Sequence, residues 1–336
     1  MQIDLRLLRQ AQALAEHGSF IRAAQALNIA QPTLSRSIKE LEARVGLPLF
    51  NRSRSGHEPT DFGRVFLQHA VELLAKAGDL EREVALTKGL RTGDLSVGCG
   101  PYVVEELAPL SAARFVAAHP GVRLRILMDD PASVARLLRT RKVDLCVAEA
   151  SILENDDDFE VVAKLVPVAA FVVVRSGHPL TTIAQPDIGD VLEFPYAQVA
   201  MLSPRLLKPI LAARRSETDD RAVSLPFPAI ECPTLQVASK IVVNSDAFTF
   251  ATLGMIRAEL EQQRVVALPQ PGWLRTEWSI VRLRKRTMSP AMIAFGDELQ
   301  RTHLDVVREE ELLRKRWYPS GDGTKGDLDD QSSPCH

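Results

Sequence analysis

The chain has 336 residues, and a prior of ~100–200 residues per domain predicts two or three domains. Hydrophobic residues make up 46% of the chain and charged residues 25%, the composition of a globular protein that can bury several cores. The formal net charge is only −2, which taken over the whole chain argues against a nucleic-acid coat or a polybasic membrane binder.

The first sixty residues are more basic than the rest of the chain. They hold eight Lys and Arg residues against five Asp and Glu residues, a balance of +3, so the remaining 276 residues carry −5. A small basic module therefore precedes a larger acidic body. A difference of a few charges is common on solvated faces, so the helix pattern of the module decides what it means.

Three short helices are predicted within the basic module. The first stops at Gly18 and carries one apolar stripe, formed by Leu5, Leu8, Ala11, Leu14 and Ala15. Ser19 can N-cap a second helix that runs through Leu27. A tight connection over residues 28–30 leads to Gln31, and Pro32 suits the first position of a third helix.

The third helix has the two faces expected of a DNA-recognition helix. Its inward face consists of Leu34, Ile38, Leu41 and Val45. Its outward groups are hydrogen-bond donors, a methyl group and cations, supplied by Gln31, Thr33, Ser35, Arg36 and Lys39. Major-groove base edges and phosphates require such groups. Beyond it, Arg52 and Arg54 on a Gly/Ser turn predict a wing that places cations on the DNA backbone or in the minor groove.

These motifs together resemble the N-terminal domain of LysR-type transcriptional regulators. The residues that carry the resemblance are Gly18-Ser19-Phe20, Ala23-Ala24, Leu27, Gln31-Pro32-Thr33-Leu34-Ser35, Ile38, Leu41-Glu42, Gly46, Leu49-Phe50 and Arg52. Ala11 stands where the family usually has an aromatic residue, which affects packing and not the DNA face. The resemblance implies a winged helix-turn-helix domain over residues 1–59. Its DNA-binding residues are then Gln31, Pro32, Thr33, Ser35, Arg36, Lys39, Arg52 and Arg54. The alternative is a helical bundle with an incidental basic surface.

A long helix is predicted next, N-capped by Thr60 and running to about Lys88. Its apolar residues recur at intervals of three and four and are Phe62, Phe66, Ala70, Leu73, Ala77, Leu80 and Val84. This near-heptad spacing favours pairing with a second copy of the helix over packing on its own domain. The resemblance implies a linker and dimerisation helix over residues 60–89, which spaces two recognition helices.

Strands and helices alternate from residue 94 to about 316, which predicts two α/β subdomains. The first subdomain is expected to hold strands at 95–97, 123–128 and 143–148, in a parallel sheet, with helices at 103–119 and 131–140. The second is expected to hold strands at 166–174, 196–200 and 248–252, with helices at 204–214 and 234–243. The chain is expected to return to the first subdomain near 265–268, then to add a strand at 278–283 and a helix at 290–314.

This acidic body resembles the effector-binding domain of the same family, which is similar to a periplasmic solute receptor. The landmarks are Gly93-Asp94-Leu95-Ser96-Val97-Gly98, His119-Pro120, Val122, Val143-Asp144-Leu145 and Gly177-His178-Pro179-Leu180. The fold class is therefore α/β and multidomain, with a periplasmic-binding-protein-like domain over residues 90–316. Subdomain I covers about 94–162 and 265–316, and subdomain II about 163–264. Residues 317–336 are predicted to be a disordered tail, because they are rich in Gly, Ser and Asp.

Two lobes joined by two crossovers predict a ligand cleft at the carboxyl ends of their strands. The candidate effector-binding residues are Cys99, Gly100, Pro101, Tyr102, Asp129, Glu149, Ala200, Met201, Asn244, Ser245 and Asp246. Backbone N–H groups at the start of the helix after Pro101 are expected to be able to hold an anionic group. Cys99 is either a thiol sensor or, as the pattern favours, a small buried residue.

Motifs of enzymes and metal proteins are missing. The run Gly98-Cys99-Gly100 lacks the third glycine of a dinucleotide fingerprint, because Val103 stands in its place. No G-x-S-x-G elbow occurs, and the acidic run at 154–158 lacks the glycine and the closing Glu of an EF-hand. The four cysteines form no C-x-x-C pair, and no H-E-x-x-H is present. We therefore expect no enzyme, no metal and no cofactor.

The N-terminus has no charged region followed by a long apolar run, and no stretch approaches the ~18 apolar residues of a membrane span. A cytoplasmic protein without a membrane partner is expected. The sequence predicts a transcriptional regulator that binds a pseudo-palindromic promoter site in double-stranded DNA and responds to a small-metabolite effector. It is expected to be a homodimer, and by resemblance a homotetramer, with RNA polymerase as a partner if it activates. The alternative is a cytoplasmic solute-binding receptor whose N-terminal helices only oligomerise.

Overall fold

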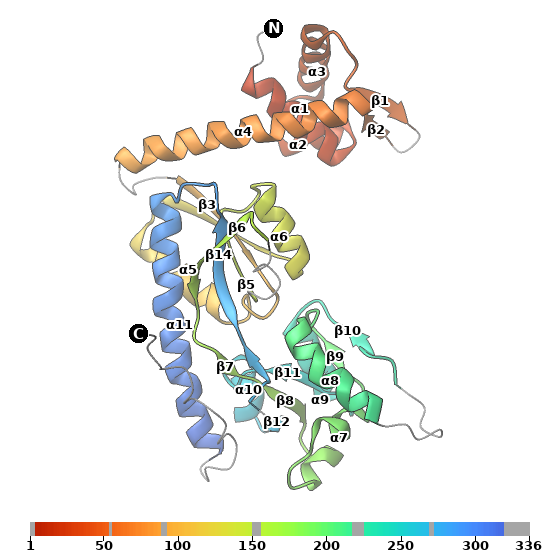
Figure 1. The fold of residues 1–336 in the computed structure, drawn as a ribbon, viewed down its shortest axis with the longest axis vertical. Helices are drawn as coiled ribbons and strands as arrows, with labels where there is room; N and C mark the ends of the chain where they lie inside the picture. Colours follow the sequence, from red (N-terminus) through yellow and green to blue (C-terminus); the bar gives the residue numbers. More distant parts are fainter. Residues whose placement is uncertain are drawn as a thin grey trace, which may run out of the picture. The chain divides into compact units, whose positions relative to one another are not determined.

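The computed structural model describes residues 4–53, 56–88, 93–149, 156–216, 225–268 and 272–318. It divides the chain into two compact units, residues 1–88 and 89–336 (Figure 1). Within the described ranges, no helix is both long and apolar enough to cross a membrane.

The first unit contains three short helices, a β-hairpin and one long helix. In chain order they are α1 (Leu5–His17), α2 (Phe20–Ala26), α3 (Gln31–Val45), β1 (Phe50–Ser53), β2 (Gly56–Pro59) and α4 (Asp61–Lys88). The Asp4 carboxylate caps α1 by accepting from the backbone N–H of Arg6 at 2.8 Å, and Gly18 ends that helix with φ at +62°. Ser19 stands at the N-cap of α2, but its side chain makes no capping hydrogen bond.

The core of the first unit contains the predicted inward face of α3. Leu34, Ile38 and Leu41 are buried, whereas Val45 is half-buried. Ala11 is completely buried in the same cluster, so its small side chain sits between closely packed helices. The three-helix arrangement predicted from the apolar spacing is therefore present.

Backbone contacts fix the hairpin β1–β2 against the helices. The Glu42 carboxylate of α3 accepts from the N–H groups of Leu49 at 2.8 Å and Phe50 at 3.2 Å. Gly63 of α4 is required at its position, because a Cβ there would lie 2.1 Å from the Leu49 carbonyl oxygen. Thr60 caps α4 as predicted, since its Oγ1 accepts from the N–H of Gly63 at 2.8 Å. The hairpin is thus held beside the C-terminal end of α3.

The second unit has two lobes, and the first is built on a mixed sheet. Among the described residues its strand order is β4 (Val122–Met128), β3 (Gly93–Cys99), β5 (Leu145–Glu149), β14 (Trp278–Leu283) and β6 (Phe159–Lys164). The strands β4 and β5 run parallel to β3, but β14 is antiparallel to both β5 and β6. The helices of this lobe are α5 (Leu107–Ala118), α6 (Pro131–Arg139) and α11 (Pro290–Trp317). The expectation of a parallel sheet is correct for its first three strands alone.

The second lobe is built around β8 (Phe171–Arg175), which pairs antiparallel with β11 (Thr249–Ala251) and β12 (Val265–Leu268). A separate parallel pair consists of β9 (Ala197–Gln198) and β10 (Ile230–Glu231). The helical segments are η2 (Pro179–Thr182), α7 (Ile188–Leu192), α8 (Pro204–Ser216), α9 (Leu235–Val243), η3 (Gly254–Ile256) and α10 (Arg257–Glu261). The predicted strands at 196–200 and 248–252 are shorter here than the sequence indicates.

The boundary between the lobes differs from the prediction. The strand β12 pairs with β8 of the second lobe, so the expected return of the chain to the first lobe at residue 265 is wrong. The crossing lies where β7 (Val168–Ala169) pairs with β13 (Arg275–Thr276), just before β14 enters the first sheet. An apolar strand such as β12 fits either sheet by sequence pattern, and its pairing decides its lobe.

The last helix continues further than predicted and belongs to both lobes. Its N-terminal half buries Phe295 and Leu299 in the first lobe, whereas Leu313 lies in the core of the second. Figure 1 shows α11 running alongside both lobes. Trp317 is its last residue, and Tyr318 stacks on Phe171 with ring centroids 5.6 Å apart. The predicted start of a disordered tail at residue 317 is therefore wrong, and residues 319–336 lie outside the described ranges.

Candidate nucleic-acid interface and effector cavity

The outer face of α3 carries the predicted DNA-binding side chains. Gln31, Pro32, Thr33, Arg36 and Lys39 are exposed, and Ser35 is half-exposed. At 3.6 residues per turn, Pro32, Ser35, Arg36 and Lys39 fall on the side opposite the buried Leu34 and Leu41. Gln31 and Thr33 lie at the two edges of that side. The packing that buries one face thereby presents the other to a ligand.

The cations of this face are available to a polyanion. Among the described residues, neither Arg36 nor Lys39 forms an ion pair with a carboxylate of the unit, whereas Arg44 near the far end of α3 pairs with Glu40. Arg52 lies in β1 at the edge of the hairpin, opposite His57, although the position of its side chain is not described. Arg54 lies outside the described residues.

The long helix α4 leaves part of its apolar stripe exposed. Phe62 is 40% exposed, Leu73 is 49% exposed and Leu80 is 63% exposed. Ala70 is buried, Phe66 and Ala77 are half-buried, and the side chain of Val84 is not described. Val65 adds to the exposed side, because it lies one turn from Phe62 on the same face. The predicted stripe thus divides into a part that packs within the unit and a part that does not.

A cavity of about 100 Å³ lies between the two lobes of the second unit. From the first lobe and the crossover it is lined by Gly100, Pro101, Tyr102, Val103, Ala148, Glu149, Arg275, Thr276 and Trp278. From the second lobe it is lined by Ala170, Ala200, Met201, Leu202, Ser203, Leu206, Phe250, Ala251, Thr252, Met255 and Leu274. The position agrees with the expectation that a ligand binds where the strands of both lobes end.

Six of the eleven predicted effector-binding residues line this cavity, namely Gly100, Pro101, Tyr102, Glu149, Ala200 and Met201. Cys99 does not, because it is fully buried in the core of the first lobe. Burial raises the pKa of its thiol to about 12, the opposite of what a reactive thiolate requires. Asp129 follows β4 at the edge of the sheet, and its carboxylate accepts from the N–H of Asp130.

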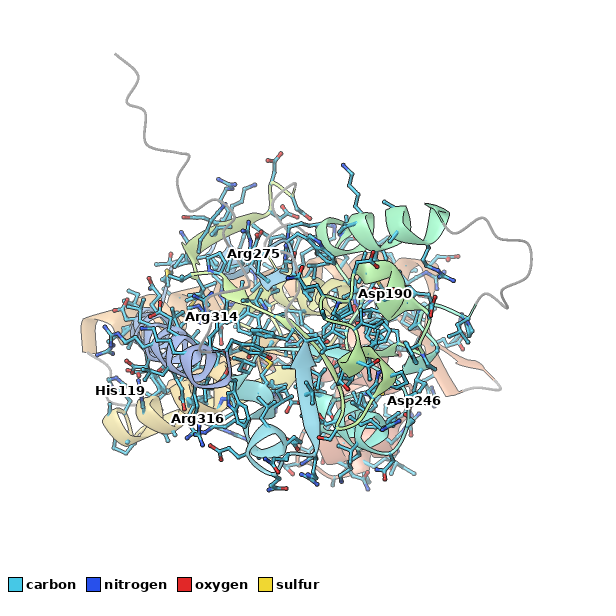
Figure 2. The ribbon with its side chains drawn as sticks, turned by 90° about the horizontal axis from the view of Figure 1, so that it is seen from below. His119, Asp190, Asp246, Arg275, Arg314 and Arg316 are labelled. Carbon is cyan, nitrogen blue, oxygen red and sulfur yellow. The ribbon has the colours of Figure 1, made fainter. Side chains whose placement is uncertain are left out.

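The predicted group at 244–246 lies away from the cavity. Asn244 and Ser245 donate to carbonyl oxygens of α9, and Asp246 pairs with Arg175 at 2.7 Å. Figure 2 shows Asp246 well apart from Arg275, which lines the cavity. Residues 244–246 lie away from the cavity because they precede β11, and it is the carboxyl end of β11 that faces the cavity.

No helix begins directly after Pro101, where the sequence predicted one at the cavity. Residues 101–106 form turns, and α5 begins at Leu107 with Glu106 at its N-cap. The backbone N–H groups expected to hold an anion are therefore displaced from Gly100 and Pro101 by more than a helical turn of chain. That expectation is wrong for this protein.

An ion-pair network connects the two lobes at the cavity. The Glu149 carboxylate of the first lobe accepts from Ser203 Oγ at 2.6 Å and from Arg205 Nε at 3.2 Å, both in the second lobe. Arg205 also lies 3.4 Å from Glu277, which accepts from Arg275 Nε at 2.8 Å. The remaining guanidinium nitrogens of Arg205 donate to the carbonyl oxygens of residues 273 and 275. We call these five side chains (149, 203, 205, 275 and 277) the interlobe network.

Sequence reasoning missed most of the interlobe network. Ser203 and Arg205 flank Pro204, the first residue of α8, and a Ser-Pro pair before an apolar stripe is a signal of a helix start. That signal places Ser203 at a helix terminus. It does not identify Glu149 as the partner, since the two residues are far apart in the chain.

Two carboxyl groups meet close behind the cavity. Glu310 of α11 accepts from the N–H groups of Leu253 and Gly254, the latter at 2.6 Å. A Cβ on Gly254 would lie 2.2 Å from Glu106 Oε1 and 3.0 Å from Glu310 Oε1, so both carboxyl groups lie close to this glycine. Burial, and secondly the charge of Glu310, raise the pKa of Glu106 to about 7. Burial raises the pKa of Glu310 as well.

No group of three His, Cys, Asp or Glu side chains suited to a metal ion occurs among the residues that the structure describes. His178 is fully buried, and its Nδ1 accepts from the N–H of Leu180 at 3.1 Å. It therefore stabilises a turn of the second lobe.

Two family models match the chain. Residues 5–64 match "Bacterial regulatory helix-turn-helix protein, lysR family", and residues 88–303 match "LysR substrate binding domain". The second match begins at residue 88, where the first compact unit of the structure ends.

Curated relatives match over most of their length. The SDS degradation transcriptional activation protein of a Pseudomonas species is 34% identical over 293 residues, covering 86% of this chain and 92% of the relative. The RuBisCO operon transcriptional regulator of Allochromatium vinosum is 27% identical over 308 residues, covering 88% and 95%.

Solved structures share the fold. A full-length OxyR variant from Pseudomonas aeruginosa superposes with a TM-score of 0.62 at 20% identity, covering 89% of this chain and 95% of the other. Full-length CbnR in complex with its target DNA superposes with a TM-score of 0.58 at 16% identity, covering 89% of this chain and all of the other.

Proposed function

The chain belongs to the LysR family of transcriptional regulators, and from this premise we propose that it binds a pseudo-palindromic promoter site as a homo-oligomer and responds to a small metabolite in the interlobe cavity. The observation that carries the proposal is the exposed face of α3, which combines donors and cations that have no carboxylate partner among the described residues. That face is suited to duplex DNA.

The residues of the interface have different roles in this proposal. Gln31, Thr33, Ser35 and Arg36 contact base edges from the N-terminal part of α3, which is the part that enters the major groove in a helix-turn-helix. Pro32 sets the start of the helix. Lys39, Arg52 and Arg54 contact phosphates and fix the register on the duplex.

Dimerisation through α4 supplies the symmetry of the DNA site. Exposed apolar side chains such as Leu73 and Leu80 lose contact with water when two copies of the helix pair. A two-fold dimer places its recognition helices one helical turn of DNA apart, about 34–36 Å, or at a multiple of it. Family resemblance supports a further association into a tetramer.

A small metabolite acts by changing the arrangement of the two lobes. It can do so only if it binds one arrangement more tightly than the other. The interlobe network is suited to such a change, because Glu149 of one lobe and Arg205 of the other form a pair that lobe motion would break. The resulting change reaches RNA polymerase if the protein activates. Since its partner is promoter DNA, we place its action in the cytoplasm and propose no enzymatic activity and no cofactor beyond the metabolite.

Salt-dependent DNA binding tests the proposal. An electrophoretic shift with sheared genomic DNA should show binding that weakens steeply when the salt concentration is raised, because phosphate contacts release counterions. The alternative, a solute receptor whose N-terminal helices only oligomerise, predicts no shift at either salt concentration. The match of residues 5–64 to a regulatory helix-turn-helix already argues against that alternative.

A further inference from the structure

We infer that the effector is an uncharged, largely hydrocarbon molecule, and not a carboxylate or an amine. The inference rests on the proposed function, because it concerns the ligand of the interlobe cavity. It follows from three properties of the cavity: the composition of its lining, the pairing of its charged groups and its size.

The lining of the cavity is dominated by hydrocarbon. Of its twenty residues, only Glu149 and Arg275 are of the types Asp, Glu, Lys or Arg. Aromatic and aliphatic side chains form most of the surface, among them Phe250, Leu206 and Met255. Such a surface is complementary to an apolar molecule, since contact removes apolar area on both sides from water.

The charges at the cavity are already paired with each other. Glu149 is bound to Arg205, and Arg275 is bound to Glu277, so each charged lining residue has a partner of opposite sign. The nitrogens of Arg205 are also occupied, by Glu149, Glu277 and two backbone carbonyls. The four charges of the interlobe network sum to zero. An ionic ligand must therefore break an existing pair before it gains one.

Helix N-termini do not compensate for this. The N-cap of α5 carries the Glu106 side chain, and the first turn of α8 is joined through Ser203 to the carboxylate of Glu149. Both positions that favour an anion are next to carboxyl groups of the protein itself. A charged ligand would thus lose its hydration without a free counter-charge, which is the costly case of burial.

The cavity has room for a small ligand. Its volume of about 100 Å³ is of the order of an apolar cavity that accommodates a single aromatic ring. A ring or a short alkyl chain with one neutral polar group satisfies the lining, the pairing and the volume together.

Calorimetric titration of the full chain with matched probes tests the inference. Benzyl alcohol, benzoate and benzylammonium share one ring and differ in charge, and hexan-1-ol and hexanoate repeat the comparison on an alkyl chain. We expect each alcohol to bind at least about tenfold more tightly than its charged counterparts. Binding of an ion as tight as that of its alcohol overturns the inference, as does failure of both alcohols to bind.

Two pairs of variants locate the binding. Ala200→Phe narrows the cavity and should abolish alcohol binding, whereas the same change at exposed Ala212 on α8 should not.

Glu149→Gln removes one of the two carboxylates at Arg205 and leaves the interlobe network with a net charge of +1, so it should raise benzoate affinity several-fold. Glu160→Gln, which removes the partner of Arg282 away from the cavity, should not. Unchanged benzoate affinity in Glu149→Gln contradicts the argument from paired charges.

The same preparation is tested separately for DNA binding without any probe. If the protein binds the alcohols but not DNA, the proposed regulatory function is contradicted and the inferred ligand class stands. If it binds DNA but neither alcohol, the ligand class is contradicted and the proposed DNA binding stands.

Discussion

Glu106 and Glu310 place two carboxyl groups at one glycine, Gly254, where the first lobe meets the second. Further charges lie on the elements around them. Glu309 precedes Glu310 on α11 and pairs with Arg257 of α10, which also binds Glu261, and Glu105 accepts from the N–H of Leu235 in α9. No cation is bound to Glu106 among the described residues, so burial beside like charges favours its protonated form.

This arrangement predicts that stability depends on pH. The folded state raises the pKa of Glu106 from an ordinary value of 4.5 to about 7, so the folded chain binds the proton more tightly than the unfolded chain does. Stability should then fall as pH rises from about 4.5 to about 7. Glu106→Gln should remove this loss and be more stable than the parent by about 1–3 kcal/mol at pH 8, with little difference near pH 4.5.

Thermal unfolding at both pH values measures the effect, and Glu311→Gln on the exposed side of α11 is the matched control. A variant at Glu106 that is no more stable than the parent at pH 8 contradicts the account of this site.

At the DNA face, Arg36 is the residue whose role is most specific. Arg36→Ala should weaken binding to the preferred site by about 1–3 kcal/mol and relax the sequence preference, because a base contact is lost. Lys39→Ala is the matched comparison. Loss of a phosphate contact should weaken binding to all DNA sequences alike and reduce the slope of log affinity against log salt concentration by about one. Anisotropy titrations on a specific and a random duplex measure both. If Arg36→Ala weakened binding to both duplexes equally, Arg36 would be a contact to the DNA phosphate backbone and not to a base.

Among the elements, α4 shows what apolar spacing can and cannot predict. The spacing of its apolar residues correctly predicted one long helix, and Thr60 caps it where expected. The spacing could not separate Ala70, which is buried, from Leu73, which is half exposed, because both belong to one stripe. Which part of a stripe packs within the unit depends on where the other helices lie.

The exposed part of α4 predicts dimerisation. Leu73→Glu should shift the protein towards monomers and weaken DNA binding, since a charge would be buried against its symmetry mate. Gln68→Glu introduces the same charge on an exposed polar position of the helix and should leave the dimer intact. Sedimentation of both variants at equal concentration measures the difference. If Leu73→Glu remains a dimer, the exposed face of α4 is not the dimer interface.

Strand pairing explains the other differences between prediction and structure. The strand β6 follows an acidic run and was missed, and β12 was expected in the wrong lobe. Local patterns locate apolar segments, but partners are chosen by contacts distant in sequence, such as that of Val281 with Val161. Local patterns likewise do not specify which end of β11 faces the cavity, and for this reason the prediction placed residues 244–246 there.

At the scale of the whole molecule, the near-zero net charge is an average over two different parts. The basic module presents Arg36 and Lys39 on the outer face of α3. The second unit pairs the charges at its cavity into a neutral network. The sequence could predict the first property, because eight bases occur within sixty residues. It could not predict the second, because Glu149 and Arg205 meet through folding of separate lobes.

The central claim, that the protein is a symmetric DNA-binding regulator, is tested most directly by selecting bound sequences from a random pool of duplex DNA. The account predicts enrichment of two inverted half-sites whose centres are about 10–10.5 base pairs apart, or a multiple of that distance. It also predicts that Leu73→Glu loses the enrichment of paired half-sites. Enrichment of a single unpaired site by the parent protein, or no enrichment at all, would contradict it.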